Sequence, residues 1–218
     1  MEKNPSFDPL KDLTPVASYA ISPQVITTNS SSKLTSLDVM IKFAKENPGK
    51  LNCATSGLGT QSHFLIEYWR TRGIDITHIP TKGASPTVTA ILGNHVDIAG
   101  SAYPPVAPHI KSGALRLLAT TAKLKEEPEA LLLTKAGFPE AAALGIWQGF
   151  FAPANLPKPI LDRLSAAFEK AILLPSVAQT LEKVGFTPAY KGPEEFKKQV
   201  AEEYQFMKEI ARNANMVK

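Results

Sequence analysis

The residues of this chain best suited to chemistry form a short run between Asn52 and His63 that is rich in glycine and hydroxyl side chains. Gly57 and Gly59 interrupt the run, and apolar residues then recur at helical spacing: Phe64, Leu65, Tyr68 and Trp69. This pattern predicts a strand, a glycine-bearing turn and the start of a helix. The N–H groups of such a turn lie at the positive end of the helix dipole, where they can bind an anion.

Hydroxyl side chains strengthen the prediction of an anion site. Thr55, Ser56, Thr60 and Ser62 can all donate hydrogen bonds to carboxylate oxygens. The alternative is that they only cap the helix, which serine and threonine do in many proteins. The run is neither a dinucleotide fingerprint, because Ser62 stands in place of the third glycine, nor a Walker A loop, because no Gly-Lys-Ser/Thr follows.

Further candidates lie at other predicted turns. Lys82 and Gly83 follow a predicted strand, at the kind of sheet edge where α/β proteins bind ligands, so the lysine either supplies a positive charge or is a solvated turn residue. Ser85 either offers a hydroxyl or caps the next helix. Ser101 and Tyr103 occupy a third loop, where Tyr103 either contacts the ligand or packs in the core. His63 itself either contacts the ligand or orients the loop from inside.

Catalysis and metal binding have little support. Cys53 and His63 are the nearest pair of nucleophile and base, but the apolar strand around Cys53 predicts a small buried hydrophobic residue. The four histidines lack the spacing of a zinc site. We therefore expect no enzyme activity, no metal ion and no cofactor.

Composition narrows the remaining classes of protein. The chain has 218 residues, of which 44% are hydrophobic and 20% charged, as in an ordinary globular protein. Its net charge of +4 is spread along the sequence, which argues against nucleic-acid binding. The apolar runs are too short to cross a bilayer. Met1 to Pro5 leads into polar sequence, so we expect no signal peptide within this chain.

Predicted strands and helices alternate, which indicates an α/β fold with a largely parallel sheet. We expect extended chain over 15–28, strands at 51–55, 74–80, 95–99, 115–121 and 146–153, and helices over 35–47, 61–70, 85–93 and 106–111. Two amphipathic helix faces follow, one formed by Ile160, Leu161, Leu164, Phe168 and Ala171 and the other by Phe196, Val200, Tyr204, Met207 and Ala211.

Several of these segments together resemble one family, the bacterial periplasmic solute receptors of tripartite tricarboxylate transport, known as TctC or Bug proteins. Their order and spacing hold over nearly the whole chain. The matching segments are 7–17, 47–52, Ser56 to Gly59 with His63, 77–80, Lys82 with Gly83, Pro86, 92–93, 96–97, 108–113 and 147–153.

The resemblance implies a type II periplasmic binding protein fold, a two-lobed Venus flytrap that closes on a small organic acid. Such receptors bind dicarboxylates, tricarboxylates or acidic amino acids in the periplasm and deliver them to the subunits of a membrane permease. They are not enzymes. Ala90 replaces the aspartate usual in the family, and residues 100–104 replace its Asp-Asn-Leu-Pro loop, which leaves the identity of the acid open.

The resemblance also implies a division of the chain. We expect residues 24–144 to form a complete second lobe, and residues 1–23 and 145–218 to form the crossover strands and the C-terminal part of the first lobe, with the N-terminal part of that lobe absent. The alternative function is a truncated remnant without binding activity, which self-associates through exposed surface of the first lobe.

Overall fold

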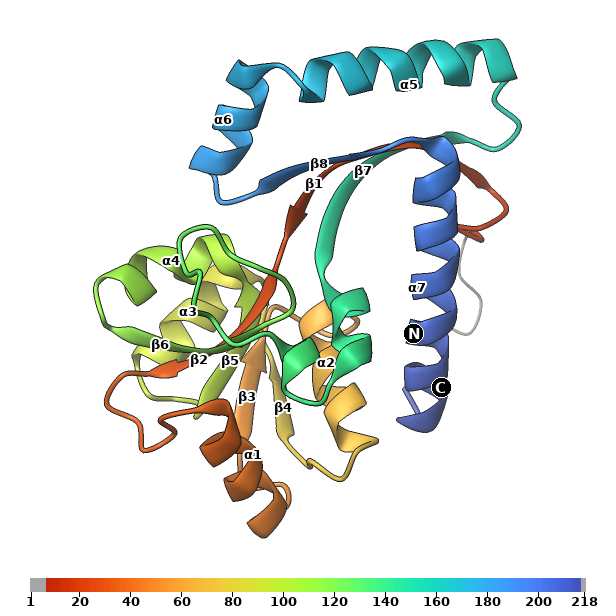
Figure 1. Ribbon diagram of the computed structural model, residues 1–218. Coiled ribbons are helices and arrows are strands. Elements are labelled where there is room, and N and C mark those ends of the chain that lie inside the picture. The colour runs from red at the N-terminus through yellow and green to blue at the C-terminus, as the bar shows by residue number, and fades with distance from the viewer. Residues whose placement is uncertain (1–6, 217–218) are drawn as a thin grey trace. The chain divides into compact units, whose positions relative to one another are not determined.

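The computed structural model describes residues 7–216 (Figure 1). The expectation about a signal peptide therefore falls outside the described residues. The chain separates into two compact units, which are described one at a time. Among the described residues, the smaller contains 7–22 and Trp147–Glu209, and the larger contains Pro23–Ile146 and Ile210–Met216. The assignment of these units to the lobes of a receptor stays a prediction.

The larger unit contains a five-stranded sheet with the order β4-β3-β5-β2-β6. Strands β3, β4 and β5 are parallel, whereas β2 is antiparallel to both of its neighbours, β5 and β6. The sheet is therefore mixed rather than largely parallel: four strands share one direction, but two of its four pairings, both made by β2, are antiparallel. The bounds are β2 Gln24–Asn29, β3 Asn52–Thr55, β4 Thr77–Pro80, β5 Ile98–Ala102 and β6 Leu115–Thr120.

Four helices connect these strands, namely α1 Leu37–Glu46, α2 Gln61–Arg70, α3 Ala84–Leu92 and α4 Tyr103–Lys111. Ser36 caps α1, because its hydroxyl accepts from the Val39 N–H at 3.2 Å. Helix α2 is buried on all sides from Ser62 to Trp69, so it forms the centre of the core rather than an amphipathic cover. Two short 3₁₀ helices, η1 Leu133–Lys135 and η2 Pro139–Leu144, end the unit.

Two expected strands are shorter than the sequence indicated. Strand β4 begins at Thr77, and β5 begins at Ile98 rather than at His95. The residues before β5 close α3 instead, because Asn94 adopts a left-handed conformation with φ 56° and the His95 N–H donates to the Ala90 carbonyl at 2.9 Å. Hydropathy alone does not distinguish this helix closure from the start of a strand.

The smaller unit contains a three-stranded sheet in the order β7-β1-β8, in which β1 is antiparallel to β8. Its elements are β1 Leu13–Ser22, β7 Ile146–Pro153, α5 Lys158–Ile172, α6 Pro175–Lys183, β8 Thr187–Lys191 and α7 Pro193–Asn213. Helix α5 packs on β1 and β8. Its predicted apolar face is only partly covered, because Ile160 is 48% exposed and Leu164 is 37% exposed.

The core of the smaller unit allows no side chain at position 149. A Cβ atom on Gly149 would overlap the Phe196 ring, with 2.6 Å to Cε1, and would lie 3.1 Å from the Ala17 carbonyl. Phe196 is fully buried and packed against Trp147, so it cannot move aside.

We expect Gly149→Ala to lower the free energy of unfolding by about 1–3 kcal/mol through overpacking. Gly145→Ala is the matched control, because its new Cβ would meet no atom closer than 3.6 Å. Chemical denaturation of the two variants measures the difference, and equal stability of both would contradict the packing described here.

Candidate functional site

Three loops that carry the predicted site residues meet at one edge of the larger sheet. Since β3, β4 and β5 are parallel, their carboxyl ends lie at the same edge, where α2, α3 and α4 begin. Residues 55–60 connect β3 to α2, residues 81–83 connect β4 to α3, and β5 runs directly into α4. Open α/β sheets bind their ligands at this kind of edge.

Backbone hydrogen bonds join the first two loops into one surface. The Gly83 N–H donates to the Ser56 carbonyl at 3.1 Å, and the Thr81 N–H donates to the Thr55 carbonyl at 2.9 Å. Gly57 has φ 141°, and a Cβ there would lie 3.4 Å from the Thr81 carbonyl oxygen. Gly57 therefore combines a backbone conformation that favours glycine with a close approach between the loops.

Two of the predicted hydroxyls are already used inside the loop. The Thr60 hydroxyl caps α2 by accepting from the His63 N–H, and it donates to the Gly57 carbonyl at 2.9 Å. The Thr55 hydroxyl is fully buried and lies 2.6 Å from Nε2 of His78. Both hydroxyls therefore make hydrogen bonds that hold the loop.

Other donors in the same place have no acceptor within residues 7–216. They are the N–H groups of Leu58, Thr60 and Gln61, the Ser56 hydroxyl, the Lys82 ammonium group and, at the start of α3, the N–H groups of Ala84 and Ser85. Ser85 does not cap α3, contrary to one reading of the sequence. Gly83 holds the cap position with no side-chain hydrogen bond, because the helix begins at Ala84, one residue earlier than expected.

The third loop is closed. Ser101 is 1% exposed, and its hydroxyl donates to the Ala102 carbonyl at 3.0 Å. Tyr103 packs in a hydrophobic cluster with its N–H bonded to the Pro23 carbonyl, and burial raises the pKa of its phenol to about 12. Prolines 104 and 105 lack N–H groups, so the start of α4 offers few donors. Both predicted residues of this loop are thus placed in the core.

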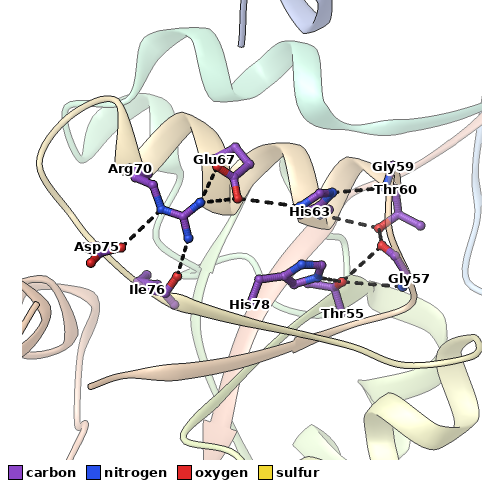
Figure 2. Close-up of polar contacts among 10 residues, drawn as sticks. All are labelled: Thr55, Gly57, Gly59, Thr60, His63, Glu67, Arg70, Asp75, Ile76 and His78. Atoms are coloured by element: carbon purple, nitrogen blue, oxygen red, sulfur yellow. Dashed lines mark hydrogen bonds and ion pairs between the residues drawn. The ribbon is translucent and has the colours of Figure 1, made fainter. Parts of the chain in front are cut away.

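His63 lies behind the first loop and is linked to a polar network (Figure 2). The ring is 7% exposed, and its Nδ1 accepts from the Gly59 N–H at 3.0 Å. Its Nε2 lies 3.6 Å from Glu67, which makes a bidentate ion pair with Arg70. His78 of β4 stacks on the His63 ring at 4.1 Å between centroids.

The sequence analysis did not identify Glu67, Arg70 or His78. A signal for the first two exists, since Glu67 is four residues after His63 and three before Arg70, which are neighbouring positions on a helix. For His78 no such signal exists, because only the pairing of β4 with β3 brings it to the loop.

Burial and neighbouring groups shift the pKa values of several of these side chains. Burial, and then the neighbouring His63, lowers the pKa of His78 to about 4. Burial of Glu67 opposes its ionisation, but the hydrogen bond from His63 and the charge of Arg70 outweigh this effect, so its pKa is lowered. Burial also raises the pKa of the Cys53 thiol to about 12, which confirms a buried hydrophobic role for that residue.

The shift of His78 predicts a pH dependence of stability. An unfolded chain binds a proton at this histidine near its ordinary value of 6.5, whereas the native state does so only near 4. The free energy of unfolding should therefore fall as pH drops from 6.5 to 4, by about 2 kcal/mol for a half-buried ring. His78→Gln should remove this contribution. Denaturation curves at several pH values measure it, and a constant difference between wild type and variant would contradict the assignment.

Residues 1–216 match the family described as tripartite tricarboxylate transporter family receptor. Protein BugT of Bordetella pertussis is 33% identical over 90% of this chain and 61% of its own length. A protein from the tcbD-tcbE intergenic region of Pseudomonas sp. strain P51 is 32% identical over 84% of this chain and 56% of its own. The chain thus spans about three-fifths of the length of these relatives.

Solved structures agree with the fold. One, described as a periplasmic transporter, superposes with a TM-score of 0.83 at 28% identity and covers 96% of this chain and 71% of its own. A protein of R. palustris solved with adipate gives a TM-score of 0.83 at 25% identity, over 99% of this chain and 73% of its own. The α/β periplasmic binding protein fold expected from the sequence is therefore confirmed.

No helix within the described residues is long and apolar enough to span a membrane. The resemblance identified from the sequence motifs is confirmed over almost the whole chain, in a family of receptors rather than of enzymes. The chain belongs to the TctC family of tripartite tricarboxylate transporter receptors.

Proposed function

We propose that this chain binds one carboxylate of a small di- or tricarboxylic acid, or of an acidic amino acid, at residues 56–61 and Lys82. The observation that carries the proposal is the set of open N–H groups at two adjacent helix starts, joined by the hydrogen bond from Gly83 to Ser56. Each hydrogen bond to a charged group contributes about 1.5–3 kcal/mol. Two helix dipoles and the lysine all favour a negative charge at this position.

The relatives support an acid as the ligand. Two structural neighbours were solved with such acids. The R. palustris protein was solved with adipate, and a second protein, from Rhodopseudomonas palustris, was solved with malate. Both of these acids carry two carboxylates. The proposed loop holds one of them, through the donors of Leu58, Thr60 and Gln61 with the Ser56 hydroxyl.

Membership of the family supports the remaining parts of this function. We infer an extracytoplasmic location, which for a bacterial receptor of this family is the periplasm, and delivery of the acid to the membrane permease of a tripartite transporter. The Lys82 charge then serves capture of the solute rather than chemistry on it.

A thermal-shift screen with succinate, malate, citrate, adipate, aspartate and glutamate tests the proposal. A ligand at one hundred times its dissociation constant adds about 2.7 kcal/mol to the free energy of unfolding, so binding raises the melting temperature. A folded protein that responds to none of the acids would overturn the proposed function.

Lys82 provides a sharper test. We expect Lys82→Met to weaken binding of the best acid up to about fivefold, because an exposed ion pair is worth up to about 1 kcal/mol. Lys50→Met is the matched control, since Lys50 precedes β3 at the opposite end of that strand. Titration calorimetry at two salt concentrations measures both effects, and equal affinities of the two variants would exclude Lys82 from the site.

The second candidate function is self-association, favoured by the exposed apolar face of α5. Ile160, Leu164 and the nearby Phe150 of β7 are each more than a third exposed. Burial of such a face against a second copy would remove apolar surface from water.

Light scattering over a range of protein concentrations tests this alternative. A dimer that Ile160→Asp disperses, while Val39→Asp on the exposed face of α1 does not, would support self-association. A monomer at all concentrations would exclude it.

A further inference from the structure

The hydrogen bond between Gly59 and His63 fixes the tautomer of the histidine. Nδ1 of His63 accepts from the Gly59 N–H at 3.0 Å, which requires a lone pair on that nitrogen. The ring proton is therefore on Nε2, the nitrogen that faces Glu67. Gly59 has φ 74°, a left-handed conformation. The hydrogen bond to His63 helps to hold Gly59 in that conformation.

Glu67 is held in its turn by groups outside the loop. Its side chain is almost completely buried and accepts two hydrogen bonds from Nη1 of Arg70, at 2.6 and 2.5 Å. Arg70 also donates to Asp75 at 3.2 Å and to the Ile76 carbonyl at 2.9 Å. A continuous chain of polar contacts thus runs from the segment before β4, through α2, to Gly59 (Figure 2).

Few other charges face the imidazole. Glu67 and Arg70 are on its own helix, and His78 stacks on it from β4. His78 accepts or donates at Nε2 with Thr55, and its lowered pKa keeps it neutral above about pH 5. Because Nε2 of His63 already carries the ring proton, a second proton must bind Nδ1. Nδ1 would then be a donor and could no longer accept from the Gly59 N–H.

We propose that Glu67 and His63 are a positioning pair for the carboxylate loop. They hold Gly59 so that the neighbouring N–H groups of Leu58 and Thr60 stay open for the ligand, and they do so only while Nδ1 of His63 carries no proton. This inference rests on the proposed function. It makes carboxylate affinity depend on the protonation of a residue that does not touch the ligand.

The direction of the pH dependence distinguishes positioning from direct contact. If His63 positions the loop, acidification removes the acceptor of Gly59, and the affinity for a carboxylate falls. If His63 instead contacted the ligand, the imidazolium charge would attract the carboxylate, and the affinity would rise on acidification.

The experiment measures malate dissociation constants between pH 5 and 8 for wild type and for His63→Asn. Oδ1 of asparagine can replace Nδ1 as the acceptor for Gly59, and it does not titrate. The ionisation of malate itself affects both proteins equally and cancels in the ratio of their affinities. We expect affinities within about threefold at pH 8 and a progressive loss of affinity in wild type relative to His63→Asn on acidification.

Three further variants complete the design. His63→Phe lacks the acceptor and should bind weakly at every pH, so recovery in His63→Asn counts as rescue. Glu67→Gln removes the charged group that faces Nε2 of His63, and it should weaken malate binding at pH 8. His95→Asn, a substitution of an exposed histidine after α3, should follow wild type. A ratio that is independent of pH, or that rises in wild type on acidification, would overturn the positioning role.

Failure of the proposed function is distinguishable from failure of this inference. If no acid binds to any of the proteins, the receptor function fails, but the pair is still tested by nuclear magnetic resonance of the His63 ring nitrogens and by exchange of the Gly59 amide. A proton on Nε2 and a protected Gly59 amide that becomes unprotected on acidification, or in His63→Phe, support the pair. A proton on Nδ1 at neutral pH would overturn it.

Discussion

Parallel pairing of β3 with β4 and β5 is the constraint on which the candidate site depends. It brings three strand ends to one edge, although the loops that follow them are more than twenty residues apart in sequence. The Gly83 to Ser56 hydrogen bond then fixes the first two loops against each other. Without this pairing, the open N–H groups at the starts of α2 and α3 would not lie on one surface.

At the same edge, some polar groups of the loop are hydrogen-bonded within the protein and others are left open. Hydroxyls of Thr55 and Thr60 satisfy partners within the protein, which leaves backbone N–H groups as most of the open donors, with the Ser56 hydroxyl and the Lys82 ammonium group beside them. This division is physically economical, because backbone donors cannot change rotamer and so lose little entropy when they bind an anion. A site of this kind depends on backbone conformation more than on the type of side chain.

The buried ion pair of Glu67 and Arg70 carries a cost that its surroundings must offset. Removal of a carboxylate from water is expensive, and attraction to one cation seldom compensates fully unless further hydrogen bonds are made. Here the arginine makes two more contacts, with Asp75 and the Ile76 carbonyl, and Nε2 of His63 lies 3.6 Å from Oε1 of the Glu67 carboxylate. Helix α2 is almost completely buried, and it therefore carries the Glu67 carboxylate inside the core with Arg70 as its partner.

The sequence by itself determined the class of fold, most of the helices and strands, and the position of the glycine-bearing turn between β3 and α2. These features rest on local signals, such as the periodicity of α2, the Ser36 cap and the two glycines of the loop. The family resemblance also followed from the order of short motifs. The start of β5 did not follow, because closure of α3 by Asn94 and His95 competes with strand formation over the same residues.

Only the tertiary structure decided which of the candidate residues face outward. Ser101 and Tyr103 are polar residues at a predicted ligand edge, yet packing of β5 and α4 buries both. His78 lies beside His63 because two strands pair in register, and no spacing along the chain encodes that contact. Local sequence fixes which backbone conformations are available, whereas the exposure of a side chain depends on long-range neighbours that assemble only in the folded protein.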